Sequence, residues 1–141
     1  QNSRKAIDAY NQLDLENKKE LIKVVNGLTD GLIKAVNLVE FEELLFKHEE
    51  VMSTVLSLPR VKDLYFADYW GAVKSLGAWG GAFVLVTSNQ DKVKTVEYFK
   101  QRGYETIFSF DEIVCQNFSM MNVTDFDEAS IDVGEIVDGQ V

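Results

Sequence analysis

The residues best suited to chemistry lie in one glycine-rich stretch, residues 71–85, which reads GAVKSLGAWGGAFVL. Glycines permit positive φ angles that turn successive backbone N–H groups into one concavity, and such a concavity suits phosphate oxygens. Lys74 would add a mobile positive charge nearby. Glycine-rich turns also form sharp hairpins that bind nothing, and the spacing alone favours that simpler interpretation. The stretch has neither the Gly-Lys-Ser/Thr of a P-loop nor the glycine spacing of a dinucleotide fingerprint.

Other polar residues indicate a site less strongly. His48 is the only histidine and Cys115 the only cysteine, so we expect a structural or solvent-facing imidazole and a small apolar thiol. Two acidic pairs are expected on the solvent face of one helix: Glu42-Glu43 and Glu49-Glu50. Asp63 and Asp68 are better candidates for metal or substrate contacts, although turn or surface positions are favoured for both. An aromatic group near the glycines is expected in the core: Tyr65, Tyr69, Trp70 and Trp79. We assign no catalytic residue and no metal ligand.

Composition and charge limit the class of protein. The 141 residues, 46% of them hydrophobic and 26% charged, are typical of one globular domain. No apolar run approaches the roughly 20 residues that span a bilayer. The net charge is −9, and from Asp111 onward the chain carries acidic residues but no Lys or Arg. Phosphate backbones and anionic membranes repel such a chain, so we expect no nucleic acid and no membrane partner. The single cysteine predicts a reducing, cytoplasmic location.

The first half of the chain predicts three helices. Ser3 is expected to cap a short helix through Tyr10. The second helix has apolar residues at spacings of three and four: Leu21, Val24, Val25, Leu28, Leu32, Ile33 and Val36. Within it, Gly27 and Gly31 indicate close packing or a kink. The third helix covers residues 41–58 and ends before Pro59.

The second half predicts short strands around one helix. The expected strands are residues 64–70, 73–76, 82–87 and 104–110. The helix between the last two is expected to be capped by Ser88 or Asn89 and stopped by Gly103. Strand, helix and strand form a βαβ-like unit, and helices on one face of a mainly antiparallel sheet give an α+β fold. Residues 115–141 have weak periodicity, so we expect an acidic tail that is ordered only in part.

The glycine-rich stretch resembles the third conserved motif of the GHMP kinases, a family that includes galactokinase, homoserine kinase, mevalonate kinase and phosphomevalonate kinase. That motif is approximately Gly-Ala-x-Lys-x-Thr-Gly-Ala-Gly-x-Gly-Gly before a hydrophobic strand. The chain supplies these residues in order: Gly71, Ala72, Lys74, Gly77, Ala78, Gly80 and Gly81. The order of elements is similar to the carboxy-terminal domain of those enzymes, and Gln1-Asn2-Ser3-Arg4 resembles its start. Trp79 replaces the first loop glycine, Leu76 replaces the usual Thr, and the family's second phosphate-binding motif has no counterpart.

The resemblance covers about residues 1–114 and implies a ferredoxin-like βαβ layer packed with helices, followed by the tail at 115–141. It implies the carboxy-terminal domain of a mevalonate-kinase-like phosphotransferase, whose substrate is a small alcohol or a phosphorylated alcohol. ATP and Mg²⁺ would be bound mainly by an N-terminal kinase domain that this chain lacks, so the chain alone should be inactive. The implied ligand-facing loop residues are Lys74, Ser75, Gly77, Ala78, Gly80 and Gly81.

Two other hypotheses remain open. The chain could be a stand-alone ferredoxin-like module that forms a homodimer or binds a small ligand. It could instead be an interaction protein whose acidic tail contacts a basic partner. A stable dimer with a metabolite-induced thermal shift and no response to nucleotide would favour the module.

Overall fold

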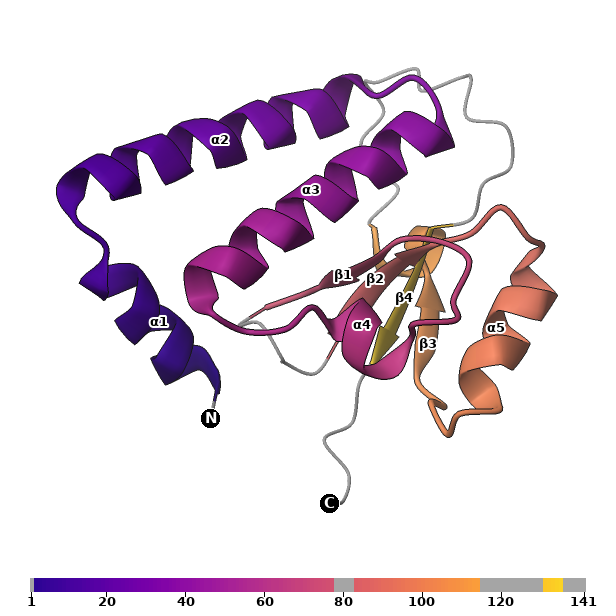
Figure 1. Cartoon of the computed structure of the whole chain (residues 1–141). Coiled ribbons are helices and arrows are strands. Elements are labelled where there is room, and N and C mark those ends of the chain that lie inside the picture. The colour runs from indigo at the N-terminus through magenta and orange to yellow at the C-terminus, as the bar shows by residue number, and fades with distance from the viewer. Residues whose placement is uncertain (1, 78–82, 115–130, 136–141) are drawn as a thin grey trace.

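The computed structural model describes residues 2–77, 83–114 and 131–135 (Figure 1). The helices are α1 (Asn2–Gln12), α2 (Leu15–Lys34), α3 (Leu38–Leu56), α4 (Val61–Tyr65), α5 (Lys92–Lys100) and α6 (Phe110–Ile113). The strands are β1 (Val73–Ser75), β2 (Phe83–Thr87), β3 (Ile107–Ser109) and β4 (Ile131–Glu135). This arrangement of a helical first half and a later sheet confirms the α+β class. No helix in the described ranges is long and apolar enough to cross a membrane.

The helix ends follow from short polar side chains. The Asp14 carboxylate accepts a hydrogen bond from the Asn17 N–H at 2.8 Å and so caps α2. The Asp91 carboxylate accepts from the Lys94 N–H at 2.8 Å and caps α5, where Ser88 or Asn89 was expected. At the C-terminal end of α3, the capping residue Ser57 takes the left-handed conformation. Ser3 was expected to be a cap, but it lies within α1 because that helix already begins at Asn2.

Helices α2 and α3 lie side by side above the sheet (Figure 1). Gly31 brings them together, since a Cβ built on it would lie 3.1 Å from the Leu44 side chain. The predicted apolar face of α2 is only partly covered by the rest of the fold, because none of the residues of α2 is buried. Three of the predicted residues are exposed instead: Val24, Ile33 and Val36.

The sheet has the strand order β1-β2-β4-β3, and every pair is antiparallel. Because β2 and β3 both run antiparallel to β4, they are parallel to each other. Helix α5 therefore connects two parallel strands that are separated by one antiparallel strand (Figure 1). This is a split βαβ unit.

Strand β4 corrects the predicted division of the chain after residue 114. Residues 131–135 lie between β2 and β3 and pair with both, so they belong to the sheet and not to an appended tail. The short alternation of Ile131, Val133 and acidic residues was too weak a signal to predict a central strand. The rest of the expected tail lies outside the described residues.

Two other predicted strands were also wrong in part. Residues 64–70 form the end of α4 and a turn, in which the Tyr69 N–H bonds the Phe66 carbonyl at 3.0 Å. The strand predicted at 104–110 is shortened to Ile107–Ser109, because Ser109 and Glu112 form a capping box that starts α6. In both places a local hydrogen bond ends the extended conformation that the apolar run favours.

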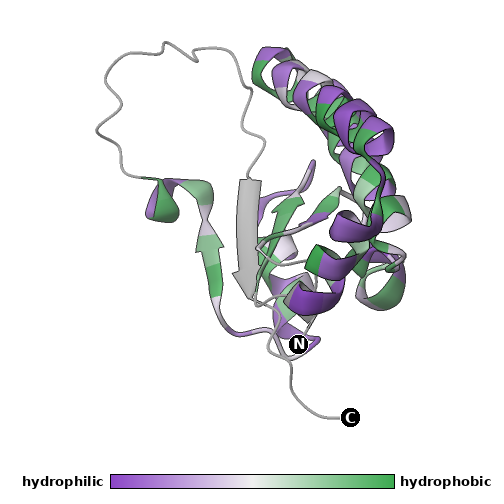
Figure 2. Ribbon diagram, turned by 90° about the vertical axis from the view of Figure 1, so that its left-hand side faces the viewer, coloured by the Kyte–Doolittle hydropathy of each residue, from purple (hydrophilic) through white to green (hydrophobic). Residues whose placement is uncertain are grey.

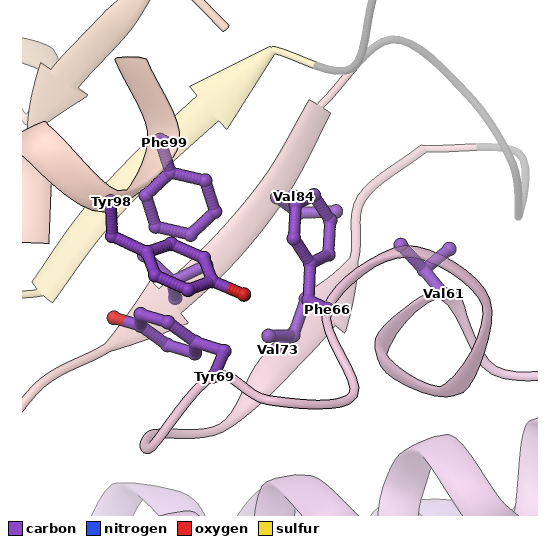
Figure 3. Close-up of a cluster of buried hydrophobic side chains, with 8 residues drawn as sticks. Val61, Phe66, Tyr69, Val73, Val84, Tyr98 and Phe99 are labelled. Carbon is purple, nitrogen blue, oxygen red and sulfur yellow. The ribbon is translucent and has the colours of Figure 1, made fainter. Parts of the chain in front are cut away.

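The core lies on one face of the sheet. Figure 3 shows the Tyr69, Tyr98 and Phe99 rings together and Phe66 near Val84. The Tyr69 and Phe99 ring centroids are 5.2 Å apart, and those of Phe66 and Phe99 are 5.3 Å apart. Burial of each such ring contributes about 2 kcal/mol. The predicted core position is thus confirmed for Tyr69, whereas Tyr65 is exposed and that prediction was wrong.

Helices α4 and α5 cover this face of the sheet, and α3 contacts the edge strand β1. Figure 2 shows the long helices of the first half on one side of the strands. On the opposite face of the sheet, Phe83 and Leu85 are only half-buried and Phe108 is exposed. The sheet therefore has one well-covered face and one that the described helices leave partly open.

Candidate functional site

The glycine-rich stretch forms a bend between two strands. Strand β1 ends at Ser75, and the Leu76 N–H donates to the Phe83 carbonyl at 3.1 Å, which joins both sides of the bend. Gly77 follows with φ +70°, a left-handed conformation that side chains with a Cβ rarely adopt. The left-handed residue thus lies just after β1 and ahead of β2, a position that fits the hairpin and the phosphate-loop interpretations alike.

Gly71, at the other end of β1, has a different role. A Cβ built on this residue would lie 1.8 Å from the Thr87 carbonyl oxygen, which is a fixed backbone atom. The first glycine of the motif is thus required because two backbones approach each other closely. It does not need to face a ligand.

A buried carboxylate ties β1 to helix α3. Glu49 is only 1% exposed, and its Oε2 accepts hydrogen bonds from the Ser75 N–H and hydroxyl, both at 3.2 Å. The Lys74 ammonium lies 3.4 Å from its Oε1. Burial of a carboxylate costs several kcal/mol in lost hydration, and the hydrogen bonds from Ser75 and the charge of Lys74 offset that cost. Glu49 was expected on the solvent face of the helix, and that prediction was wrong.

The Ser75 N–H is an edge group of the sheet. Bonds from Leu76 N to Phe83 O and from Thr87 N to Ala72 O pair β1 with β2. Since such bonds alternate along an antiparallel pair, the Ser75 N–H between them points away from β2. Strand β1 is at the edge of the sheet, and Glu49 therefore closes that edge next to the bend.

The Lys74 ammonium is held in place by three acceptors. It lies 3.2 Å from His48 Nδ1, 3.4 Å from Glu49 Oε1 and 3.5 Å from its neighbour's carbonyl, Ser75 O. Burial and the Lys74 charge lower the pKa of His48, so the imidazole can accept a bond from the ammonium. Burial raises the pKa of Glu49, although the bonds from Ser75 and the Lys74 charge act against that rise. The charge expected to be mobile is fixed against α3.

A second carboxylate anchors the far end of the same hairpin. The Thr87 hydroxyl donates to Glu42 Oε1 at 2.5 Å, while its oxygen accepts from the Ala72 N–H at 2.9 Å. The Lys62 ammonium donates to the Gly71 carbonyl and lies 4.9 Å from the centre of the Phe46 ring. Glu42 is half-buried, so it also departs from the predicted solvent face.

The structure brings together only part of the predicted loop. Lys74 and Ser75 contact Glu49, and Gly77 forms the exposed start of the bend. Three predicted residues lie outside the described residues: Ala78, Gly80 and Gly81. Sequence reasoning missed Glu49, yet a signal was present. Glu49 follows Leu45 by four residues and precedes Leu56 by seven, and both leucines are buried.

Of the remaining candidates, Asp63 and Asp68 form surface contacts, and Trp79 and Cys115 lie outside the described residues. Asp63 pairs with Arg60 at 2.8 Å. Asp68 accepts from the Tyr98 hydroxyl at 2.7 Å and from the Arg102 guanidinium at 2.5 Å. Exposed pairs of this kind contribute little stability. In the described part of the chain, no three metal-ligating side chains lie together.

Comparisons with protein families, with curated proteins and with solved structures found no match to this chain.

Proposed function

We propose that this chain is the carboxy-terminal domain of an ATP-dependent kinase of the GHMP type, which phosphorylates a small alcohol or a phosphorylated alcohol. The observation that carries the proposal is the bend itself. Lys74 and Ser75 end one strand, Gly77 turns the backbone through a left-handed conformation, and the buried strand β2 follows. This local structure agrees with the motif that the sequence resembles. A bend buried within a helix would have removed the basis of the proposal.

The fold gives further support. The β2–α5–β3 unit, with β4 between its parallel strands, is a split βαβ connection, and this connection supports the proposal of a ferredoxin-like layer. Exposed apolar residues on and after α2 are typical of a surface that another domain covers: Val24, Ile33 and Val36. We propose that this other domain is the N-terminal kinase domain. A single cysteine in the sequence supports a reducing, cytoplasmic location.

In this proposal ATP and Mg²⁺ are bound mainly by the N-terminal domain. The described residues of this chain contribute an ammonium group at Lys74 and the backbone of the bend. Phosphoryl transfer depends on positioning and on neutralisation of charge, so a loop that carries one lysine can assist the reaction but cannot perform it alone. In this arrangement Lys74 and Ser75, at the end of β1, would hold the loop so that it faces the ligand.

The upstream coding sequence and an activity assay test the proposal together. The sequence directly before Gln1 should encode a domain with a Pro-x-x-x-Gly-Leu-Gly-Ser-Ser-Ala loop that opens a helix. A protein that contains both this upstream domain and residues 1–141, called the joined protein below, should phosphorylate a small alcohol with ATP, whereas purified residues 1–141 should not.

In the joined protein, Lys74→Met should lower kcat/KM by at least about tenfold. Exposed Lys100 on α5 provides the control, Lys100→Met, with unchanged kcat/KM. Turnover by residues 1–141 alone would overturn the proposal.

A stand-alone ferredoxin-like module is the second candidate, and one observation favours it. The open face of the sheet presents half-buried Phe83 and Leu85 and exposed Phe108, which a second copy or a small ligand could cover. A dimeric mass in solution, together with thermal shifts by metabolites but not by nucleotides, would favour this module over the kinase.

A further inference from the structure

Two consecutive residues of the bend converge on one carboxylate of α3. Ser75 supplies its backbone N–H and its hydroxyl to Glu49 Oε2, and Lys74 supplies its ammonium to Oε1. The Ser75 residue is 6% exposed and the Lys74 side chain is 20% exposed, so the contacts lie at the boundary between core and solvent. Both oxygens of Glu49 are therefore engaged by the strand that enters the bend.

Helix α3 is a firm support for this carboxylate. It runs from Leu38 to Leu56, and Glu49 lies in its interior beside buried Leu45. Two helical turns earlier, Glu42 accepts a bond from Thr87 at the far end of the hairpin. The helix thus holds the β1–β2 hairpin at both ends, and Glu49 is the anchor next to Gly77.

We infer that Glu49 is a positioning residue for the Lys74–Gly77 bend: it holds the Lys74 ammonium and the Ser75 backbone against α3. The catalytic consequence rests on the proposed function, because it concerns the same loop. The positional part does not, because it concerns only where Lys74 lies and can be measured without a substrate.

His48 provides a direct probe of that position. It is the only histidine of the chain, its Nδ1 lies 3.2 Å from the Lys74 ammonium, and that charge helps to lower its pKa. Removal of a nearby carboxylate charge by itself lowers the pKa of an imidazole. If Glu49 holds Lys74 in place, its removal releases the ammonium toward solvent, and the pKa of His48 rises. A positional role and a purely electrostatic role therefore predict opposite signs.

The experiment is an NMR titration of the His48 ring in residues 1–141. Glu49→Gln should raise the pKa of His48, in the same direction as Lys74→Met, which removes the ammonium altogether. Glu49→Asp keeps the charge but withdraws it by one methylene group, and it should also raise this pKa. The control is Glu50→Gln, because Glu50 is the adjacent and exposed carboxylate; it should leave the pKa of His48 unchanged. A fall or no change with both Glu49 variants would overturn the inference.

Hydrogen exchange gives an independent measurement. The Ser75 amide should exchange about tenfold faster in Glu49→Asp than in Glu50→Gln, since its partner is withdrawn. The Thr87 amide, which bonds Ala72 O within the sheet, should change far less. Equal acceleration of both amides would mean general loss of stability and would overturn a positional role.

Kinetics of the joined protein then separate this inference from the proposed function. Glu49→Gln should lower kcat/KM about tenfold, while Glu50→Gln should match the natural protein. Absence of kinase activity in the natural protein would refute the proposed function but leave the NMR result as the measure of positioning. An active natural protein with full activity in Glu49→Gln would overturn the catalytic part of the inference.

Discussion

The two ends of the β1–β2 hairpin are both anchored by a carboxylate of α3, but the residues next to the two anchors differ in how deeply they are buried. Glu42 and Glu49 lie on α3, and each accepts a hydrogen bond from one end of the hairpin. At the Glu42 end, Thr87 is fully buried and Gly71 is packed against its carbonyl. At the Glu49 end, Lys74 remains partly exposed and Gly77 is exposed at the start of the bend.

This difference shows how one helix can serve both stability and a site. At the Glu42 end the Thr87 carbonyl accepts from the Tyr69 hydroxyl, and the Thr87 hydroxyl bonds both Glu42 and the Ala72 N–H. At the Glu49 end the anchor fixes the strand, and the backbone is exposed two residues later at Gly77. Substitutions at the first end should therefore affect folding, and substitutions at the second should affect the bend more than the fold.

The largest effect is expected for Gly71→Ala. Its Cβ would lie 1.8 Å from the Thr87 carbonyl oxygen, so one of two hydrogen-bonded backbones must move. The free energy of unfolding should fall by about 3 kcal/mol or more, as measured by urea denaturation.

The matched control for this substitution is Gly27→Ala. Gly27 lies inside α2, and a Cβ built on it meets nothing within 4 Å. The same added methyl group should there raise the free energy of unfolding by roughly 0.5–1 kcal/mol, because alanine favours a helix. A gain in stability at Gly71, or a loss well below about 1 kcal/mol, would contradict the close backbone approach.

A smaller effect on stability is expected at the other end of the hairpin for Gly77→Ala. The added Cβ meets no neighbour within 4 Å, but φ +70° places it in the left-handed region. The free energy of unfolding should fall by about 1 kcal/mol. Gly77→Asn should lose less, since asparagine tolerates this conformation better than alanine. Equal losses for the two variants would indicate that the bend does not depend on this backbone angle.

The sequence was a good guide where one strong pattern governed the structure. The apolar run before Thr87 predicted β2, and the glycines predicted the bend that precedes it. It was a poor guide where distant partners decide. Residues 131–135 form a strand that pairs on both sides with strands from earlier in the chain, β2 and β3. Glu49 is buried because Ser75 and Lys74, far along the chain, supply its donors.

The smallest expected effect is a dependence of stability on pH through His48. Its pKa in the folded chain is lowered by burial and by Lys74, whereas the unfolded value is near 6.5. Between these two values the unfolded chain binds more protons, so the free energy of unfolding falls as pH decreases below about 6.5. Glu49 acts in the opposite direction, since its raised pKa means that, as pH decreases, the folded chain takes up this proton before the unfolded chain does.

The variant His48→Gln removes only the contribution of His48. Urea denaturation between about pH 7.5 and 5.5 should show that this variant loses less stability than the natural chain. Parallel curves would mean that neither burial nor the Lys74 charge lowers the pKa of His48 in the folded chain, which would contradict its contact with the Glu49 end of the hairpin.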